Sequence, residues 1–569
     1  MLKGIAVSEG MACGTAVVIK SESGGREKTY RQAESSEKER SRFREAYDSF
    51  IKDAEKAAEG LKSRGLEQEA GILLSHVEMV KDPSVASGIE ENISNGCCAE
   101  EAVDKTLGFF ADMFEATGDE LTMQRASDVR DINNELIKKL TGNEGPDISS
   151  LPEGSVLVTD ELTPSMTVDM KTGSVVGIVA ETGGYTSHSA ILARALGVPA
   201  VLSVAGATKL IAEGQDVAVD GISGDVIVSP DNDEKKRCEE KAEAFRRQKA
   251  LTEEFRGKMT VTASGEKKEV VANIGNAGDV SAAKDGDAEG VGLFRTEFLY
   301  MDRDSAPDEE EQLASYRKVA EAFAPAPVII RTLDVGGDKD VQYLDMGKED
   351  NPFMGFRAIR YCLENQQLFR TQLRALLRAN TAGNIRIMLP MVTELQEIRD
   401  VRKLIDESVE ELKAEGKEFG QNISLGIMVE TPAAAATADI LAEEADFFSI
   451  GTNDLTGYMM SADRGNGKVA YLYSVYQPAV LRMIRNVCEA AHKAGIPVGM
   501  CGEAAADPAL IPCLLGFGLD EFSVGSRQVL ATRRTISLWS RQEAEDTVRK
   551  VMTLHTVEET EAYLNSIKK

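Results

Sequence analysis

The stretch that decides the fold is residues 425–454, LGIMVETPAAAATADILAEEADFFSIGTND. It contains two short apolar runs, LGIMVE at 425–430 and DFFSIGTND at 446–454, separated by a segment of helical composition. Two apolar runs joined in this way are typical of a strand–helix–strand unit in an α/β fold.

The same alternation recurs throughout residues 260–569. The other apolar runs are VVANIG (270–275), GVGLFR (290–295), PVIIRTLD (327–334), IRIMLPM (385–391), IPVGMCGE (496–503) and DEFSV (520–524). Together with the first two they make eight runs separated by helical segments, a pattern that predicts a C-terminal (β/α)₈ TIM barrel over 260–569.

The N-terminal part of the chain has a different pattern of apolar runs. Residues 1–20 indicate one or two short strands broken by glycines, and strand-like runs return in 146–230. Because residues 1–20 alone cannot close a core, we expect both segments to form one α/β domain.

The residues between these two segments are helical in character. Residues 21–145 are rich in Glu, Lys, Arg, Ala and Leu at helical spacing, and their breaks predict an inserted bundle of four or five helices. The highly charged segment 231–259 predicts a solvated linker helix before the barrel. The predicted architecture is therefore a multidomain α/β protein.

Composition excludes several functional classes. The chain has 569 residues and a net charge of −29, which argues against a nucleic-acid or anionic-membrane binder. Its eight cysteines form no CxxC pair, and no apolar stretch reaches the ~18 residues of a membrane span. We expect a reduced, cytoplasmic protein.

Polar residues recur where the predicted barrel strands end, and these ends share one mouth. They are Arg295, Glu297, Arg331, Asp334, Glu430, Asn453, Asp454, Cys501 and Glu503. Arg295, Arg331 and the loop residue Arg464 supply planar forks that suit a small polyanion, with Arg357 as a weaker fourth candidate.

Two carboxylates and a thiol complete the candidate site. Glu430 and Asp454 could hold a hard divalent cation such as Mg²⁺, or they could instead pair with the nearby arginines. Cys501 carries a thiol that is mostly protonated at neutral pH and can donate a proton.

His188 lies outside the barrel, in ETGGYTSHSAILARALGVPA. Thr186 or Ser187 can cap a helix that continues to Gly197, so His188 is expected at a helix N-terminus. There the dipole favours a neutral, nucleophilic imidazole, and backbone N–H groups can hold a phosphoryl group.

The motifs match a known family along the whole chain. GGYTSHSAILAR, GVGLFRTEFLYMDRD, RTLDVGGDK, NPFMGFRAIR, IMVETPAA, GTNDLT, DRGN and GMCGE occur in order. The chain resembles the enzyme I family of the bacterial sugar phosphotransferase system, the phosphoenolpyruvate-protein phosphotransferases. One departure is Tyr185, at a position where the family usually has arginine.

The resemblance implies a two-step phosphoryl transfer from phosphoenolpyruvate to His188 and then to a histidine-containing phosphocarrier protein, with release of pyruvate. It implies that Arg295, Arg331, Asn453, Asp454 and Arg464 bind the substrate and that Glu430 and Asp454 bind Mg²⁺, or Mn²⁺ as the alternative. Cys501 would protonate the enolate. The helical insertion would bind the phosphocarrier, and the barrel would form a homodimer.

Two other readings remain open at this point. Pyruvate phosphate dikinase and phosphoenolpyruvate synthase share the histidine domain and the barrel, but this sequence contains no additional nucleotide-binding segment. A non-catalytic regulator that binds phosphoenolpyruvate as a signal is favoured by Tyr185 and disfavoured by the complete set of candidate site residues.

Overall fold

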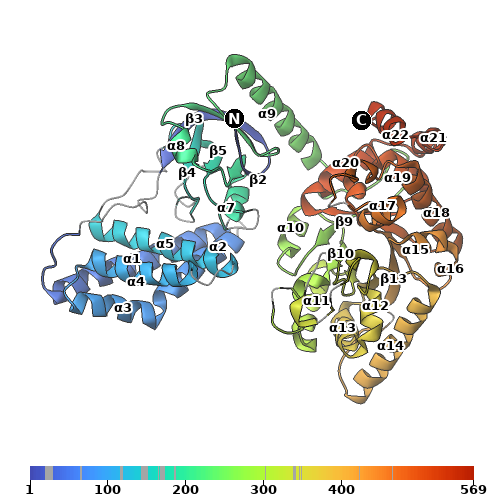
Figure 1. Cartoon of the computed structure of the whole chain (residues 1–569), viewed down its shortest axis with the longest axis horizontal. Coiled ribbons are helices and arrows are strands. Elements are labelled where there is room, and N and C mark those ends of the chain that lie inside the picture. The colour runs from blue at the N-terminus through green and yellow to red at the C-terminus, as the bar shows by residue number, and fades with distance from the viewer. Residues whose placement is uncertain are drawn as a thin grey trace. The chain divides into compact units, whose positions relative to one another are not determined.

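The chain divides into two compact units, Met1–Ala250 and Leu251–Lys569 (Figure 1). The computed structural model describes residues 1–19, 30–63, 67–115, 120–142, 151–163, 166, 173–184, 188–301, 303–337, 341–344, 346–347, 349–421, 423–463 and 466–569. Among the described helices, none is both long and apolar enough to cross a membrane.

The first unit contains one eight-stranded mixed sheet with the order β1-β8-β7-β3-β4-β5-β6-β2. Strands β3 to β6 are parallel, and the other pairings are antiparallel. The strands are β1 (Leu2–Lys3), β2 (Ile5–Ser8), β3 (Met11–Ile19), β4 (Ser155–Thr159), β5 (Val175–Ala180), β6 (Ala200–Leu202), β7 (Asp216–Asp220) and β8 (Asp225–Val228). The N-terminal segment thus pairs with strands from the region after the helices.

That segment forms three strands, not the one or two expected. Gly4 separates the first two, and a side chain there would collide with the carbonyl oxygen of Leu202. Gly10 separates the second from the third, and its φ of 127° lies in the region that favours glycine.

Alternating side chains of the sheet build two cores. Leu157 packs on one face with α7 (His188–Leu196), whereas Val156 and Val158 pack on the other face with α8 (Ala207–Leu210). This alternation follows from the period of two residues in a strand. Every residue of β4 is buried, which makes it a central strand.

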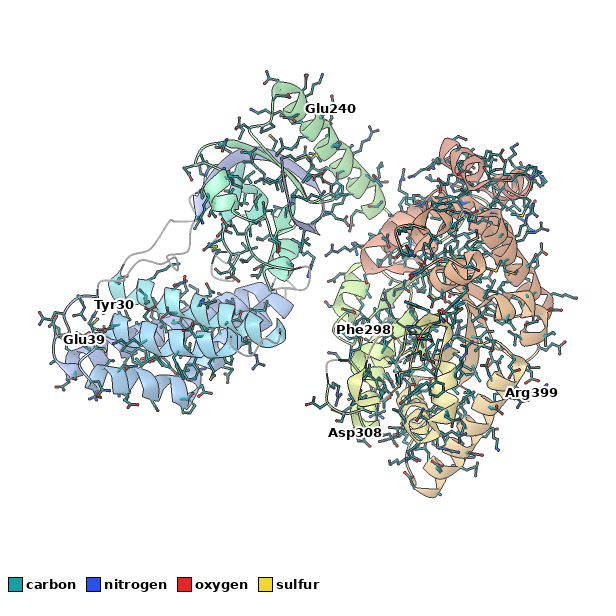
Figure 2. All side chains as sticks on the ribbon, viewed as in Figure 1. Tyr30, Glu39, Glu240, Phe298, Asp308 and Arg399 are labelled. Carbon is teal, nitrogen blue, oxygen red and sulfur yellow. The ribbon has the colours of Figure 1, made fainter. Side chains whose placement is uncertain are left out.

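Among the described residues between β3 and β4, five helices occur: α1 (Ser36–Ser63), α2 (Glu67–Lys81), α3 (Pro83–Ser94), α4 (Ala99–Glu115) and α5 (Glu120–Thr141). Their apolar faces form a core of their own. Arg42 on α1 donates hydrogen bonds to Glu100 on α4 and to the Leu140 carbonyl on α5, each at 2.7 Å. Tyr30, beside Glu39 in Figure 2, bonds to Asp104.

The linker helix α9 (Asn232–Glu253) begins with reciprocal hydrogen bonds between Asp231 and Glu234, which cap its first turn. Cys238 is its buried residue, and the labelled Glu240 projects outward in Figure 2. The helix is therefore a largely solvated segment, and the boundary between the two units falls within it.

The second unit is a closed barrel of eight parallel strands, which confirms the predicted fold. Its strands are β9 (Glu269–Ile274), β10 (Val291–Arg295), β11 (Val328–Arg331), β12 (Ile385–Leu389), β13 (Ser424–Val429), β14 (Phe448–Ile450), β15 (Val498–Met500) and β16 (Glu521–Gly525). Strand β9 closes the barrel by pairing with both β10 and β16.

Helices surround these strands in Figure 1. They are α10 (Val280–Asp285), α11 (Glu309–Phe323), α12 (Ile359–Glu364), α13 (Gln366–Ala379), α14 (Leu395–Ala414), α15 (Pro432–Ala436), α16 (Ala438–Leu441), α17 (Thr452–Met460), α18 (Pro478–Ala494), α19 (Ile511–Phe517), α20 (Val529–Ser537), α21 (Arg541–Val551) and α22 (Val557–Ser566). The barrel interior holds a buried cluster of Leu293, Ile329, Met388, Met428, Phe447 and Cys501. The barrel is thus filled by side chains.

Candidate active site

The candidate substrate residues gather at the C-terminal ends of the barrel strands. Arg295 ends β10 and Arg331 ends β11, and the two are partners in the register of these neighbouring strands. Glu430 follows β13, and Cys501 follows β15. The sequence positions of these residues therefore place them around one mouth.

Arg331 is the centre of a buried ionic network. Its guanidinium group, in a residue only 6% exposed, donates to Glu297 at 2.6 Å and contacts Asp334 at 3.0 Å. Burial alone would lower the pKa of Arg331, but Glu297, Asp334 and Glu430 outweigh burial and raise it. The guanidinium is therefore permanently charged and held in one orientation.

Asp334 joins a second guanidinium to the first. Arg357 donates to the other carboxylate oxygen of Asp334 at 2.8 Å, and Arg357 is also buried. The Arg357 guanidinium lies 3.5 Å from Asp454 and 3.4 Å from the Tyr458 hydroxyl. Two fixed positive groups that share one carboxylate suit a ligand with several anionic oxygens.

The two candidate metal ligands have different surroundings. Glu430 is 2% exposed and accepts the Met391 N–H at 2.7 Å, and within the described part of the chain it forms no ion pair. Burial, with Asp454 and Asp334 nearby, raises the pKa of Glu430 to about 8. Asp454 lies in the first turn of α17 and contacts Arg357.

The two carboxylates therefore differ in whether they pair with an arginine. Asp454 has an arginine partner, whereas the carboxyl group of Glu430 forms no ion pair among the described residues. The two residues fit a divalent ion that takes one or two carboxylates and completes its coordination with substrate and water. Among the described residues, no group of three or more His, Cys, Asp or Glu could hold a metal ion.

Cys501 is 7% exposed and belongs to the apolar cluster inside the barrel. Burial raises the pKa of its thiol to about 11, so the thiol is protonated at neutral pH. Asn273 donates to the carbonyl of Cys501 at 3.3 Å and accepts the Ser523 hydroxyl at 2.6 Å. The Cys501 carbonyl is thereby held by Asn273 of β9, whose side chain is in turn fixed by Ser523 of β16.

The remaining substrate candidates are less tightly held. Arg295 is exposed, and its guanidinium carbon lies 6.0 Å from the ring centre of Phe298, which Figure 2 labels. Asn453 lies next to Asp454 in the first turn of α17, and its carbonyl accepts the Tyr473 hydroxyl at 2.9 Å. Arg464 lies outside the described residues.

Sequence reasoning gave no role to several residues of this network. Glu297 and Asp334 were visible only as polar residues after strands, and Arg357 was only a weaker fourth candidate for binding a polyanion. Asn273 and Tyr458 were missed. A polar residue in the apolar run VVANIG was the available signal for Asn273.

The predicted nucleophile belongs to the other unit. Helix α7 begins at His188, while the His188 side chain and the neighbouring Tyr185, Thr186 and Ser187 lie outside what the structure describes. Ser189 donates to the Leu162 carbonyl at 2.8 Å, and Leu192 of α7 is buried in the core that also contains Leu157 of β4. The start of α7 is therefore anchored to the sheet.

Comparisons with known proteins cover all three regions of the chain. Residues 249–540 match the family model "PEP-utilising enzyme, PEP-binding domain", 151–224 match "PEP-utilising enzyme, mobile domain", and 3–125 match "PEP-utilising enzyme, N-terminal". An NMR solution structure of an Enzyme I protein is 34% identical, covers 43% of this chain and all of that one, and has a TM-score of 0.35.

Two curated relatives extend over nearly the full length. The phosphoenolpyruvate-protein phosphotransferase of Bacillus subtilis (strain 168) is 44% identical over 565 residues, 99% of each chain. The protein of the same name from Staphylococcus epidermidis is 40% identical over 570 residues, 100% of each chain. With these matches and the geometry of the barrel mouth, the chain belongs to the family of phosphoenolpyruvate-protein phosphotransferases.

Proposed function

We propose that His188 attacks the phosphorus of phosphoenolpyruvate held at the barrel mouth and then passes the phosphoryl group to a histidine of a small phosphocarrier protein. The overall activity follows from the family: the chain is a phosphoenolpyruvate-protein phosphotransferase, which acts in the first step of sugar phosphotransferase uptake. The observation that carries the assignment of the site is the pair Arg331 and Arg357, joined through Asp334.

In the first step, the P–O bond of phosphoenolpyruvate breaks as an N–P bond to His188 forms, and the enol oxygen keeps the electron pair. Charge spreads over the phosphoryl oxygens during this transfer, so fixed cations are the main catalytic requirement. Arg331 is preorganised for that task, and Arg295, Asn453 and Arg464 are proposed to complete the binding of the substrate.

A divalent cation, Mg²⁺ or alternatively Mn²⁺, would be held by Glu430 and Asp454 and would supply positive charge to the substrate oxygens. The methylene carbon of the enolate then takes a proton from the Cys501 thiol and becomes the methyl group of pyruvate. The raised pKa of that thiol supports a donor, because the thiol is almost fully protonated at neutral pH.

Further parts of the proposal concern partners and location. The helices α1 to α5 form a body with its own core, and we assign them to phosphocarrier binding. The barrel is assigned to formation of a homodimer. All eight cysteines lie in the described residues and are free, which supports a reducing compartment such as the cytoplasm.

The test is phosphoryl transfer from labelled phosphoenolpyruvate to candidate phosphocarriers, with wild-type protein and a Tyr185→Arg variant. We expect acid-labile, base-stable label on the wild type and its transfer to a carrier. A chain that binds phosphoenolpyruvate without labelling would be the non-catalytic regulator that Tyr185 favours. A requirement for ATP or AMP would overturn the assignment in favour of a dikinase or synthase.

A further inference from the structure

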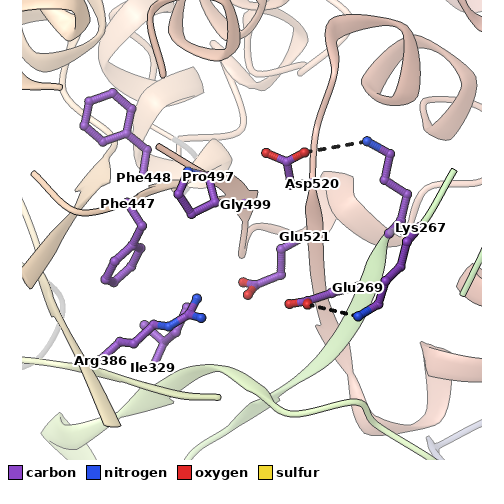
Figure 3. Close-up of a pocket in the computed structure, with 11 residues that line it drawn as sticks. Lys267, Glu269, Ile329, Arg386, Phe447, Phe448, Pro497, Gly499, Asp520 and Glu521 are labelled. Carbon is purple, nitrogen blue, oxygen red and sulfur yellow. Dashed lines mark ion pairs between the residues drawn. The ribbon is translucent and has the colours of Figure 1, made fainter. Parts of the chain in front are cut away.

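A cavity lined by charged and apolar side chains lies at the opposite end of the barrel from the candidate active site. It has a volume of about 190 Å³. The residues at its edge precede or begin strands: Lys267, Lys268 and Glu269 at β9, Arg386 at β12, Pro497 at β15, and Asp520 and Glu521 at β16. We call this cavity the floor pocket (Figure 3).

Most of the charges around the floor pocket already have partners. Lys267 lies 4.0 Å from Glu269, and Lys268 lies 3.7 Å from Asp520. Figure 3 draws these two ion pairs on the same side of the pocket. Two charged residues of opposite sign, Glu521 and Arg386, take part in neither ion pair.

Glu521 has an unsatisfied buried oxygen. The residue is 7% exposed, and its Oε1 atom is buried with no hydrogen-bond partner. Gly499 leaves room for that oxygen, since a Cβ at this position would approach it to 2.9 Å. A buried polar oxygen without a partner is unfavourable, so a bound donor group would be strongly favoured.

Arg386 faces Glu521 in Figure 3 without forming an ion pair with it. The guanidinium is nevertheless near enough to lower the pKa of Glu521, against the larger effects of burial and Glu269, which raise that pKa to about 7. Within the described residues Arg386 has no ion pair of its own. The Arg386 guanidinium, a group well suited to binding carboxylates, therefore faces the Glu521 side chain, one oxygen of which has no hydrogen-bond donor.

Apolar side chains form another wall of the floor pocket. Ile329 and Phe447 line it, and both also belong to the buried cluster that contains Cys501. The cavity corresponds to about six water volumes at ~30 Å³ each, which is small for a drug-sized ligand and sufficient for a small amino acid.

We propose that the floor pocket binds a small zwitterion of the α-amino acid class, with its ammonium group on Glu521 and its carboxylate on Arg386. Its aliphatic side chain would lie against Ile329 and Phe447. A simple metal cation fits less well, because Arg386 would repel it and lysines already occupy two of the three carboxylates. The site is separate from the mouth that holds phosphoenolpyruvate.

The test is calorimetric titration of the full-length protein with L-alanine and L-valine, alongside ethylamine and propionate, which each carry only one of the two charges. We expect saturable binding of an amino acid with a Kd of about 1 mM or tighter. Either single-charge compound should bind at least about tenfold more weakly, equivalent to ~1.4 kcal/mol.

Glu521→Gln and Arg386→Gln should each weaken amino-acid binding at least about tenfold. The matched control is Glu266→Gln, since Glu266 lies outside the pocket and pairs with Arg541. Phosphoenolpyruvate should not displace the amino acid. Absence of saturable binding to the wild type, unchanged binding in both pocket variants, or competition with phosphoenolpyruvate would overturn the proposal.

Discussion

The two compact units hold their candidate functional residues in different ways. In the barrel unit, Arg331, Asp334 and Arg357 form a buried network in which each charge is fixed by another. In the N-terminal unit, α7 starts at His188 and is anchored by apolar packing and by Ser189. One unit therefore concentrates charge at its barrel mouth, whereas the other presents the start of a helix.

This difference implies that the two half-reactions have separate requirements. Under the proposed function, cleavage of phosphoenolpyruvate would need the barrel network and His188, whereas exchange of a phosphoryl group with the phosphocarrier would need His188 and the N-terminal unit. Variants that affect one half-reaction and spare the other would sharpen the contrast between the units.

The largest expected effect is the split between His188→Ala and Arg331→Lys. His188→Ala should abolish both half-reactions. Arg331→Lys keeps the charge but loses the fork, and it should slow labelling by phosphoenolpyruvate about 10²–10³-fold. Exchange of label between the phosphorylated carrier and the Arg331→Lys protein should stay within about twofold of wild type. Equal loss of both half-reactions in Arg331→Lys would break the division.

Removal of divalent metal is expected to act on the barrel alone. Treatment with a chelator should stop labelling by phosphoenolpyruvate, because Glu430 and Asp454 would then lack the cation that neutralises the substrate. Exchange with the phosphorylated carrier should continue, and added Mg²⁺ should restore the first step. Full labelling in metal-free solution would contradict the proposed role of the two carboxylates.

Cys501→Ala tests proton donation within the barrel. Pyruvate release should slow about 10²-fold or more, while the affinity for phosphoenolpyruvate stays close to that of wild type. Cys488→Ala is the matched control, since that thiol is also buried but lies in α18. The measurement is a coupled pyruvate assay together with a binding titration. A normal rate in Cys501→Ala would remove the proposed donor.

A stability difference should also separate the units. Arg533 is 2% exposed and bonds to Thr260, the Phe255 carbonyl and Asp287 in the barrel unit. Arg533→Met leaves Asp287 without this partner and should destabilise the barrel by about 3–5 kcal/mol. Calorimetry should show a lower melting temperature for the barrel only, with little change for the exposed control Arg541→Met. A shift of both transitions would show that the units unfold together.

The smallest expected effect concerns Ser189, which anchors the helix that begins at His188. Ser189→Ala removes the hydrogen bond to the Leu162 carbonyl, and it should cost the N-terminal unit about 1 kcal/mol. The melting transition of the barrel should not move. A loss confined to the barrel transition would contradict the assignment of this contact to the N-terminal unit.

The barrel could be predicted because buried parallel strands are short apolar runs at regular intervals. The ends of the strands were harder to predict from the sequence. The run at 446–454 predicted a strand up to Asp454, whereas β14 ends at Ile450 and Thr452 already begins α17. An apolar run predicts which residues are buried, but it does not predict where strand pairing stops and a helix starts.

The site was predicted where chemistry and strand order coincide, as for Arg331 and Cys501. Arg357 was only a weaker fourth candidate, and folding brings its guanidinium group to Asp334. Glu521 gave no signal at all. It begins a strand, and its burial opposite Arg386 depends on the closure of β16 against β9.

The most direct test of the account is to locate the phosphoryl group after reaction with labelled phosphoenolpyruvate and divalent metal. Peptide mapping at neutral to alkaline pH should find acid-labile phosphate on His188, and His188→Ala should carry none, whereas His555→Ala should be labelled normally. Stable label on any other residue of the wild type, or undiminished label on the His188→Ala protein, would contradict the transfer between the two units.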